Sequence, residues 1–211
     1  MNRILRNWKK YLTVDDFYKN GVVILDFGSQ YTQLIARRVR EQKVFSEILP
    51  SETSLENILE RKPAALILSG GPSSVYGDEA PGFDPLVLDT ELPILGICYG
   101  LQLLAHHAGG SVESAGQGEY GFAEIEVDDS TGLFSEVSES SQVWMSHMDR
   151  VTKLPDNWHI LAHSSNGIIA AMANKDQSRV ATQFHPEVAH TEGGETILRN
   201  FLFKIADCAP T

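Results

Sequence analysis

The segment from residue 92 to residue 110, LPILGICYGLQLLAHHAGG, constrains the fold more than any other part of the chain. Its first part is a short apolar run, long enough for one buried strand. Its second part has the apolar spacing of a packed helix that ends at two glycines. Cys98 lies between the two parts, with Gly96 two residues before it and Gly100 two residues after it. This is the pattern of a nucleophile elbow, in which the missing side chains let the backbone turn tightly.

The position of Cys98 at the start of a predicted helix favours reactivity. Free N–H groups and partial positive charge at a helix N-terminus stabilise a thiolate and, later in a reaction, an oxyanion. An isolated cysteine is also commonly a small buried core thiol. The elbow alone leaves both interpretations open, so the rest of the chain has to decide between them.

Apolar runs and helical patterns alternate along the first half of the chain. The runs predict buried strands at residues 21–27, 45–49, 64–68 and 94–97, with helices near residues 34–39 and 55–59. Strands that are apolar throughout and separated by helices are typical of a parallel sheet covered on both faces. We therefore predict an α/β fold with an open, mixed, largely parallel central sheet and helices on both faces.

The pattern changes in the second half. Residues 122–127 alternate between apolar and polar, which predicts a half-exposed antiparallel strand. Further strands are predicted at residues 143–145, 158–163, 168–173 and 180–184, followed by an amphipathic helix at 196–206. The sequence thus predicts a smaller antiparallel strand region, whose strand order it leaves open.

A glycine-rich segment, Ser-Gly-Gly-Pro-Ser-Ser, directly follows the predicted strand at residues 64–68. Gly70 and Gly71 would allow backbone N–H groups to face a ligand without an intervening Cβ. Sites in open α/β sheets lie beyond the carboxyl ends of the strands, so this segment and Cys98 are expected at the same edge. A plain Gly-Pro turn is the alternative. No lysine follows, which argues against a nucleotide-binding P-loop.

His185-Pro186-Glu187 follows the last predicted strand. A cysteine nucleophile needs a nearby base, and the base needs an acceptor that fixes its tautomer. Residues i and i+2 of an extended segment project to the same side, so Glu187 can reach the imidazole of His185. A lone histidine at a strand end is more often structural, so the pair gains weight only together with Cys98.

Composition excludes several classes of protein. Among 211 residues, 28 are Asp or Glu and 17 are Lys or Arg, which argues against a nucleic-acid or anionic-membrane surface. Two cysteines cannot form a disulfide framework, so we expect a cytoplasmic protein. No apolar run approaches the roughly 18–20 residues of a membrane span. Residues 1–20 lack the pattern of a secretory signal and are interpreted as an N-terminal extension.

Three segments together resemble the signature segments of the class I, triad-type glutamine amidotransferases. They are Gly96-Ile-Cys98-Tyr-Gly100-Leu-Gln102, Ser69-Gly-Gly-Pro-Ser73 and Gln183-Phe-His185-Pro-Glu187. Finer motifs, LDFGSQY at 25–31, SGGPSSVY at 69–76 and WMSHMD at 144–149, resemble the amidotransferase domain of GMP synthases. The resemblance covers residues 21–208 as one amidotransferase domain and implies the flavodoxin-like fold of this family.

The resemblance implies hydrolysis of glutamine to glutamate and ammonia through a γ-glutamyl thioester. Cys98 would be the nucleophile, His185 would take and return the proton, and Glu187 would orient His185.

The same resemblance implies roles for five more residues. Backbone N–H groups of Gly71 and Tyr99 would form the oxyanion hole. Gln102, Ser146 and Asp149 are the candidates for binding the α-amino and α-carboxylate groups of glutamine. An exposed turn position is the alternative interpretation of Asp149.

Partners follow from the resemblance as well. A GMP synthase also contains an ATP-pyrophosphatase domain, which uses ATP and Mg²⁺ to aminate XMP to GMP, and its Ser-Gly-Gly-x-Asp-Ser phosphate loop has no match here. We therefore expect no cofactor and no metal in this chain, with ATP and Mg²⁺ held by the partner domain. Residues 209–211 are expected to begin the linker to that domain, whether the chain is separately encoded or an excised domain.

Three alternatives stand beside this interpretation. A cysteine hydrolase of the α/β-hydrolase type is disfavoured, because its acid normally lies between the nucleophile and the histidine in sequence. A non-catalytic regulatory domain would be expected to have lost part of the Cys98, His185 and Glu187 set, which is complete. An amidotransferase that serves another acceptor is opposed only by the finer motifs.

Overall fold

The computed structural model describes residues 20–210, except for the side chains of residues 115 and 117. Within this range one sheet has the strand order β2-β1-β3-β4-β9-β8-β7-β5-β6. The strands are β1 Val22–Asp26, β2 Ser46–Pro50, β3 Ala65–Leu68, β4 Ile94–Ile97, β5 Ser111–Val127, β6 Ser140–Lys153, β7 Trp158–Ser164, β8 Ile169–Asn174 and β9 Arg179–Thr182. The helical elements are α2 Thr32–Glu41, α3 Leu55–Leu59, η1 Pro85–Asp89, α4 Tyr99–His107, η2 Gly132–Phe134, α5 Gly194–Asn200 and η3 Phe201–Ile205. The predicted N-terminal extension, apart from Asn20, lies outside the described residues, as does Thr211.

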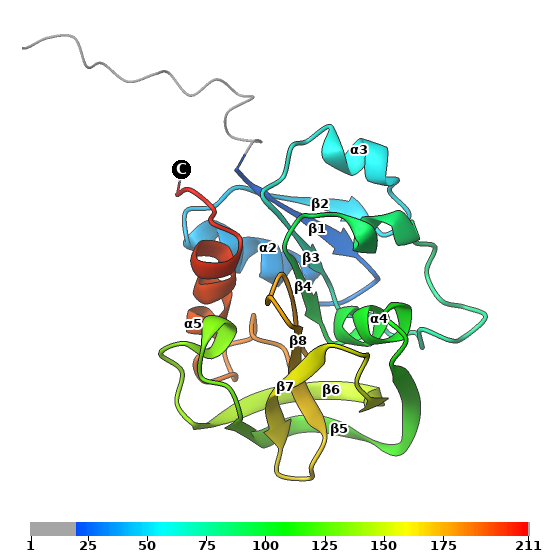
Figure 1. Cartoon of the computed structure of the whole chain (residues 1–211), viewed down its shortest axis with the longest axis vertical. Coiled ribbons are helices and arrows are strands. Elements are labelled where there is room, and N and C mark those ends of the chain that lie inside the picture. Colours follow the sequence, from blue (N-terminus) through cyan, green and yellow to red (C-terminus); the bar gives the residue numbers. More distant parts are fainter. Residues whose placement is uncertain (1–19, 211) are drawn as a thin grey trace, which may run out of the picture.

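Strands β2, β1, β3, β4 and β9 form the parallel half of the sheet. Alternate residues of each strand point to opposite faces. Val22 and Ile24 of β1 therefore join a core with α2 and α5, whereas Val23 and Leu25 join a core with α3 and α4. Figure 1 shows these helices on opposite sides of the strands. The predicted α/β fold with helices on both faces of a mixed sheet is confirmed.

Strands β8, β7, β5 and β6 continue the same sheet in antiparallel pairs beyond β9. Strand β5 is longer than predicted, because it begins at Ser111 and not at residue 122, and β6 extends well beyond residues 143–145. The two strands pair from Ser111 and Lys153 to Glu126 and Ser140, with a register shift between Ser114 and Glu119. Pairing with β6 thus holds residues 111–121 in a strand, although this polar and glycine-rich segment has no alternation of apolar and polar residues.

The last helix begins close to its predicted position but does not stay regular. Helix α5 is followed directly by a π-helical turn over Phe201–Ile205. The apolar residues that predicted this helix pack into the core next to α2: Ile197, Leu198, Phe201 and Leu202.

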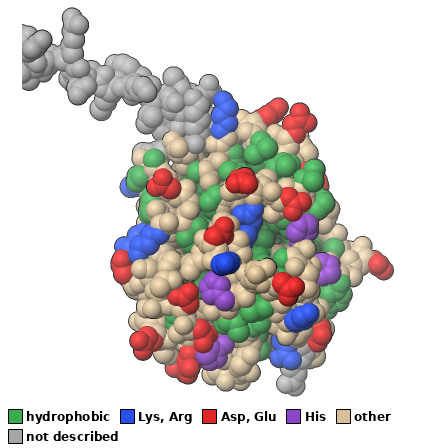
Figure 2. Space-filling model, in the orientation of Figure 1, with side chains coloured by type: hydrophobic (Ala, Val, Ile, Leu, Met, Phe, Trp, Pro, Cys, Tyr) green, Lys and Arg blue, Asp and Glu red, His purple; other side chains and the backbone are tan. Residues whose placement is uncertain are grey.

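Acidic side chains are spread over the visible face of the molecule and outnumber the basic ones in the sequence (Figure 2). Among residues 20–210, no helix combines the length and the apolar character needed to cross a membrane.

Gly96 of β4 is required by the close approach of α4. A Cβ at this position would lie 2.6 Å from both the carbonyl carbon and the oxygen of Gly100, atoms that cannot swing away. We expect Gly96→Ala to lower the free energy of unfolding by about 1–3 kcal/mol, through overpacking. Gly82→Ala is the matched control, since its Cβ would meet its nearest neighbour, Glu52, at an ordinary 3.5 Å. Urea unfolding of both variants checks this, and equal stability would contradict it.

Candidate active site

The backbone at Cys98 has φ 54° and ψ −101°, a conformation that residues with side chains rarely adopt. The residue lies between β4 and α4, and its N–H donates to the carbonyl oxygen of Thr182 at 2.8 Å. That bond ties the turn to the end of β9, the strand that leads into His185. The strained turn therefore places the thiol where two neighbouring strands end.

His185 and Glu187 lie beside Cys98. The Nδ1 atom of His185 is 2.8 Å from Oε1 of Glu187, and both side chains are buried. The side chain of Cys98 lies close enough to His185 to raise the pKa of the imidazole. Burial alone would lower the pKa of His185, but the Glu187 carboxylate and Cys98 raise it to about 10. A protonated imidazole next to a thiol favours the thiolate, so the three residues have the geometry of a nucleophile, base and orienting acid.

Several contacts hold His185 and Glu187 in place. The hydroxyl of Thr191 donates to the carbonyl oxygen of His185 at 2.7 Å. The ring of Tyr31 packs edge to face against the imidazole, with the two ring centroids 5.0 Å apart. Nε of Arg38 donates to the main-chain oxygen of Glu187 at 3.0 Å. The second carboxylate oxygen of Glu187 is buried and has no hydrogen-bond partner among the described residues. Among the described residues, the carboxylate of Glu187 therefore makes its side-chain hydrogen bond to the imidazole of His185.

The glycine-rich segment after β3 lies next to His185 and Cys98. A Cβ on Gly70 would lie 3.2 Å from Cε1 of His185 and 3.6 Å from Cβ of Cys98. A Cβ on Gly71 would lie only 2.6 Å from the carbonyl oxygen of Phe27, so a side chain is excluded there. Tyr99 is the first residue of α4, and its N–H therefore has no partner within the helix. Of the two residues predicted for the oxyanion hole, Gly71 lines the same pocket as Cys98, and Tyr99 directly follows Cys98 in the chain.

A pocket of about 430 Å³ opens over the thiol, which is a typical volume for a small-molecule site. Six of the eight predicted site residues line it, namely Gly71, Cys98, Gln102, Ser146, Asp149 and His185. Glu187 and Tyr99 are not among its lining residues. The structure therefore brings the predicted chemistry and the predicted binding groups to one cavity.

The three residues predicted to bind glutamine have different surroundings. Nε2 of Gln102 donates to the main-chain oxygen of Asp149 at 2.9 Å, so this amide is partly used within the protein. The main-chain oxygen of Ser146 lies 3.6 Å from the sulfur of Cys98. Asp149 belongs to β6 and is 5% exposed, so the alternative of an exposed turn position is wrong. Asp149 is an acidic residue in the lining of the pocket.

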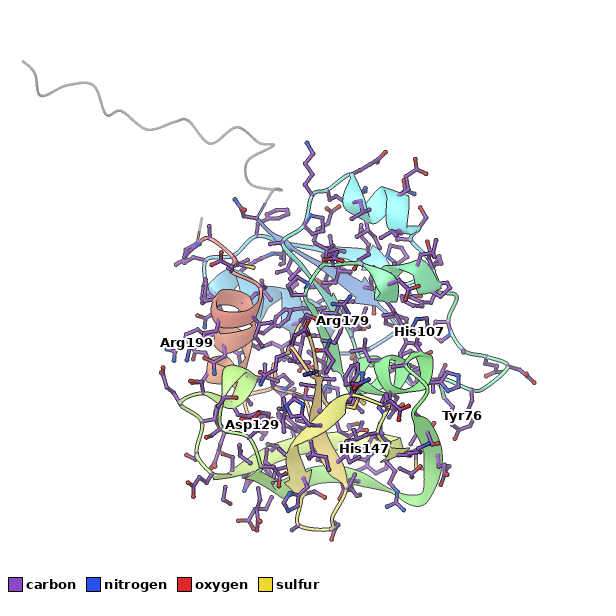
Figure 3. The ribbon with its side chains drawn as sticks, viewed as in Figure 1. Tyr76, His107, Asp129, His147, Arg179 and Arg199 are labelled. Carbon is purple, nitrogen blue, oxygen red and sulfur yellow. The ribbon has the colours of Figure 1, made fainter. Side chains whose placement is uncertain are left out.

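Sequence reasoning gave no role to several residues of this site, among them Tyr31, His147 and Gln183. Tyr31 and His147 line the pocket, and His147 is fixed by the main-chain oxygen of Asp149 at 3.0 Å and by Glu119 at 3.2 Å. Burial lowers the pKa of His147, with Glu119 opposing the shift. Figure 3 labels His147 among the antiparallel strands below α4. Gln183 lies 3.7 Å from the Cys98 sulfur. Each of the three lies inside one of the family-like motifs given above, and that was the only sequence signal that could have found it.

Among the described residues, no three His, Cys, Asp or Glu side chains are grouped so that they could hold a metal ion.

Sequence comparisons identify the relatives of this chain. The model of the family "Glutamine amidotransferase class-I" matches residues 23–205. A glutamine-hydrolyzing GMP synthase from Trichormus variabilis is 50% identical over 190 residues, which are 90% of this chain and 35% of that protein. A GMP synthase from Synechococcus sp. strain CC9311 is 51% identical over 193 residues, which are 91% and 37% of the two proteins. The chain thus spans 35–37% of the length of these curated relatives.

Solved structures agree with the sequence comparisons. A protein from Thermoplasma acidophilum, assigned provisionally as a GMP synthase subunit, superposes with a TM-score of 0.79 at 33% identity over 89% of this chain and 94% of that one. A glutamine amidotransferase from Thermotoga maritima has the same fold, with a TM-score of 0.71 at 20% identity over 89% and 99% of the two chains. Since the family model matches nearly all of the described residues, the chain belongs to the class-I glutamine amidotransferase family.

Proposed function

We propose that this chain is the glutaminase component of a GMP synthase and hydrolyses glutamine to glutamate and ammonia. The observation that carries the proposal is the buried arrangement of Cys98, His185 and Glu187 beside a pocket of about 430 Å³. The similarity to glutamine-hydrolyzing GMP synthases over 90% of the chain supports the choice of substrate.

The first half of the reaction forms a thioester. The Cys98 thiolate attacks the side-chain amide carbon of glutamine, and the carbonyl oxygen becomes an oxyanion held by the backbone N–H groups of Gly71 and Tyr99. His185 then gives its proton to the amide nitrogen, the C–N bond breaks, and ammonia leaves. Glu187 keeps the imidazole oriented throughout and stabilises its positive charge while it is protonated.

The second half returns the enzyme to its starting state. His185, now neutral, takes a proton from a water molecule as the water attacks the γ-glutamyl thioester. The same two N–H groups hold the second oxyanion. The C–S bond breaks, Cys98 leaves as the thiolate, and glutamate is released, with His185 protonated again.

Asp149 suits the α-ammonium group of glutamine by its charge and its position in the pocket, while Gln102 and Ser146 are assigned to the α-carboxylate. We expect Asp149→Asn to raise the KM for glutamine roughly 10- to 100-fold with little change in kcat, since it removes a charge that binds the ground state and the transition state alike. Steady-state ammonia release measures both constants. Asp156→Asn, an exposed change outside the pocket lining, is the control, and an unchanged KM in Asp149→Asn would contradict the assignment.

The ammonia is proposed to serve a partner. The named relatives extend far beyond the matched region, and this supports an ATP-pyrophosphatase part that aminates XMP to GMP with ATP and Mg²⁺. In this proposal the partner holds ATP and Mg²⁺, and this chain supplies ammonia. A cytoplasmic location fits the two free cysteines, Cys98 and Cys208.

Ammonia release from glutamine tests the proposal, first with the chain alone and then with a GMP synthase ATP-pyrophosphatase partner, ATP, Mg²⁺ and XMP. We expect glutamine hydrolysis that rises with the loaded partner and is coupled to GMP formation. If the partner is shown to associate but the rate of glutamine hydrolysis does not change, the chain would be an amidotransferase for another acceptor. No hydrolysis under either condition would indicate a non-catalytic domain and would overturn the proposal.

A further inference from the structure

We propose that Gln183 is a positioning residue for the nucleophile, and that its side-chain amide donates an N–H to the sulfur of Cys98 in the thiolate form. This inference deepens the proposed function and rests on the role of Cys98 in it. The geometry points to Gln183 through three independent features: its place in the sheet, the orientation of its amide and the other groups around the sulfur.

The main chain places Gln183 next to the sulfur. It directly follows β9, and its own N–H donates to the carbonyl oxygen of Ala170 at 2.8 Å. The preceding residue, Thr182, accepts the 2.8 Å hydrogen bond from the N–H of Cys98. The side chain of Gln183 is fully buried, and its Nε2 atom lies 3.7 Å from the sulfur. Strand pairing on both sides therefore fixes where this amide lies.

A relay of hydrogen bonds determines which end of the amide faces the sulfur. The main-chain oxygen of Asp149 can only accept, so the Gln102 amide must present its nitrogen there, at 2.9 Å. The same nitrogen of Gln102 lies 3.5 Å from Oε1 of Gln183. The Gln183 oxygen is thereby turned toward Gln102, and its NH₂ group is turned toward Cys98. The orientation follows from the partners and not from an arbitrary choice between oxygen and nitrogen.

The groups around the sulfur differ in which protonation state they stabilise. The main-chain oxygen of Ser146, at 3.6 Å, can accept only from the neutral thiol. The N–H of Gln183 stabilises the thiolate, and it does so in a buried site where a hydrogen bond to a charged group is strong. His185, oriented by Glu187, is the titratable group in contact with the sulfur, and His147 and Asp149 line the same pocket. Gln183 is thus a neutral donor that stabilises the thiolate before it attacks glutamine and again when it leaves the thioester.

The test is the pH dependence of Cys98 alkylation by iodoacetamide, followed by mass spectrometry of the peptide that contains Cys98. In Gln183→Met, which has a similar length and no N–H, we expect the midpoint of alkylation to move up by about one pH unit. We also expect kcat for glutamine hydrolysis to fall roughly 10- to 100-fold, with KM changing less than about threefold. Gln142→Met, an exposed change in β6, is the matched control and should leave the midpoint unchanged.

Two further variants keep the test decisive if Gln183→Met folds poorly. Gln183→Glu has almost the same shape and replaces the donor with a carboxyl group, so its midpoint should rise at least as far. Gln102→Met leaves Gln183 in place but removes its orienting partner, and its effect on the midpoint should be smaller than, and not additive with, that of Gln183→Met. A Gln183→Met or Gln183→Glu protein with wild-type thermal stability and a wild-type alkylation midpoint would overturn the proposal.

The alkylation midpoint does not depend on turnover of glutamine, so this inference and the proposed function fail in different ways. No glutamine hydrolysis by the wild-type chain, with or without the loaded partner, would remove the proposed function while leaving the measured midpoints as they are. Unchanged midpoints together with hydrolysis that requires Cys98 would remove only the role of Gln183.

Discussion

Cys98→Ala is expected to lower kcat for glutamine hydrolysis by roughly 10⁴-fold or more, to the background rate, because loss of a triad nucleophile removes the covalent route entirely. Binding should survive, since the pocket keeps its other lining residues. Ammonia release measures the rate, and calorimetry measures glutamine binding to the same variant. Loss of rate without loss of binding would assign Cys98 to the chemical step.

Cys208→Ala is the matched control. Cys208 is also buried, at 5% exposure compared with 4% for Cys98, but burial raises the pKa of its thiol to about 11. A thiol with a raised pKa is a poor nucleophile at neutral pH. Cys208→Ala should therefore keep kcat within about twofold of wild type. Hydrolysis that persists in Cys98→Ala would refute the nucleophile assignment.

Glu187→Gln is expected to lower kcat by roughly 10³- to 10⁴-fold, the loss found when the orienting acid of a serine-protease triad is replaced by its amide. The carboxylate is one of the two groups that counteract burial at His185, with Cys98 as the other, so the pKa of His185 should fall from about 10 in the variant. An NMR titration of His185 gives the pKa directly, and the pH profile of kcat/KM reports the same group in turnover.

The same change has a consequence for stability. In the wild-type protein the pKa of His185 is raised to about 10, above the roughly 6.5 of an unfolded histidine. The native state therefore binds more protons between these values. The stabilisation is fully present below pH ~6.5 and is lost as the pH rises through the folded pKa. Urea unfolding at several pH values should show this decline in wild type and a weaker one in Glu187→Gln.

Glu192→Gln serves as the control for both measurements. Glu192 is exposed, and its carboxylate accepts a hydrogen bond from the main-chain N–H of Gln142 in β6. Its rate and its stability profile should match wild type. A Glu187→Gln protein with the wild-type pKa of His185 would show that the carboxylate does not control the imidazole, whatever the effect on rate.

The central strands of the parallel half, β1, β3 and β4, could be predicted from the sequence because they are buried on both faces. Such strands carry few polar side chains, and Ala65–Leu68 and Ile94–Ile97 carry none. The predicted bounds differ from the observed ones by one residue for the first of these two strands and not at all for the second. Residues 111–121 could not be predicted in the same way. Their strand is held by pairing with β6, and pairing across the sheet leaves no periodic pattern in a single segment.

The candidate site shows the same division. Cys98 lies between two glycines that the backbone requires, and His185 and Glu187 are two residues apart on one segment, so local patterns were enough. Gln183 acts across strands, and its environment is set by β8, Gln102 and the turn at Cys98. A buried glutamine has no spacing that distinguishes it from an exposed one. Contacts between distant segments were needed to find it.

Trapping with hydroxylamine tests the central claim most directly. A γ-glutamyl thioester on Cys98 would be intercepted by hydroxylamine, so glutamine should yield γ-glutamyl hydroxamate at the expense of glutamate while ammonia release continues. The Cys98→Ala protein should form none. Glutamate formation at the wild-type rate, with no hydroxamate at any hydroxylamine concentration, would mean that water attacks glutamine directly and would contradict the account.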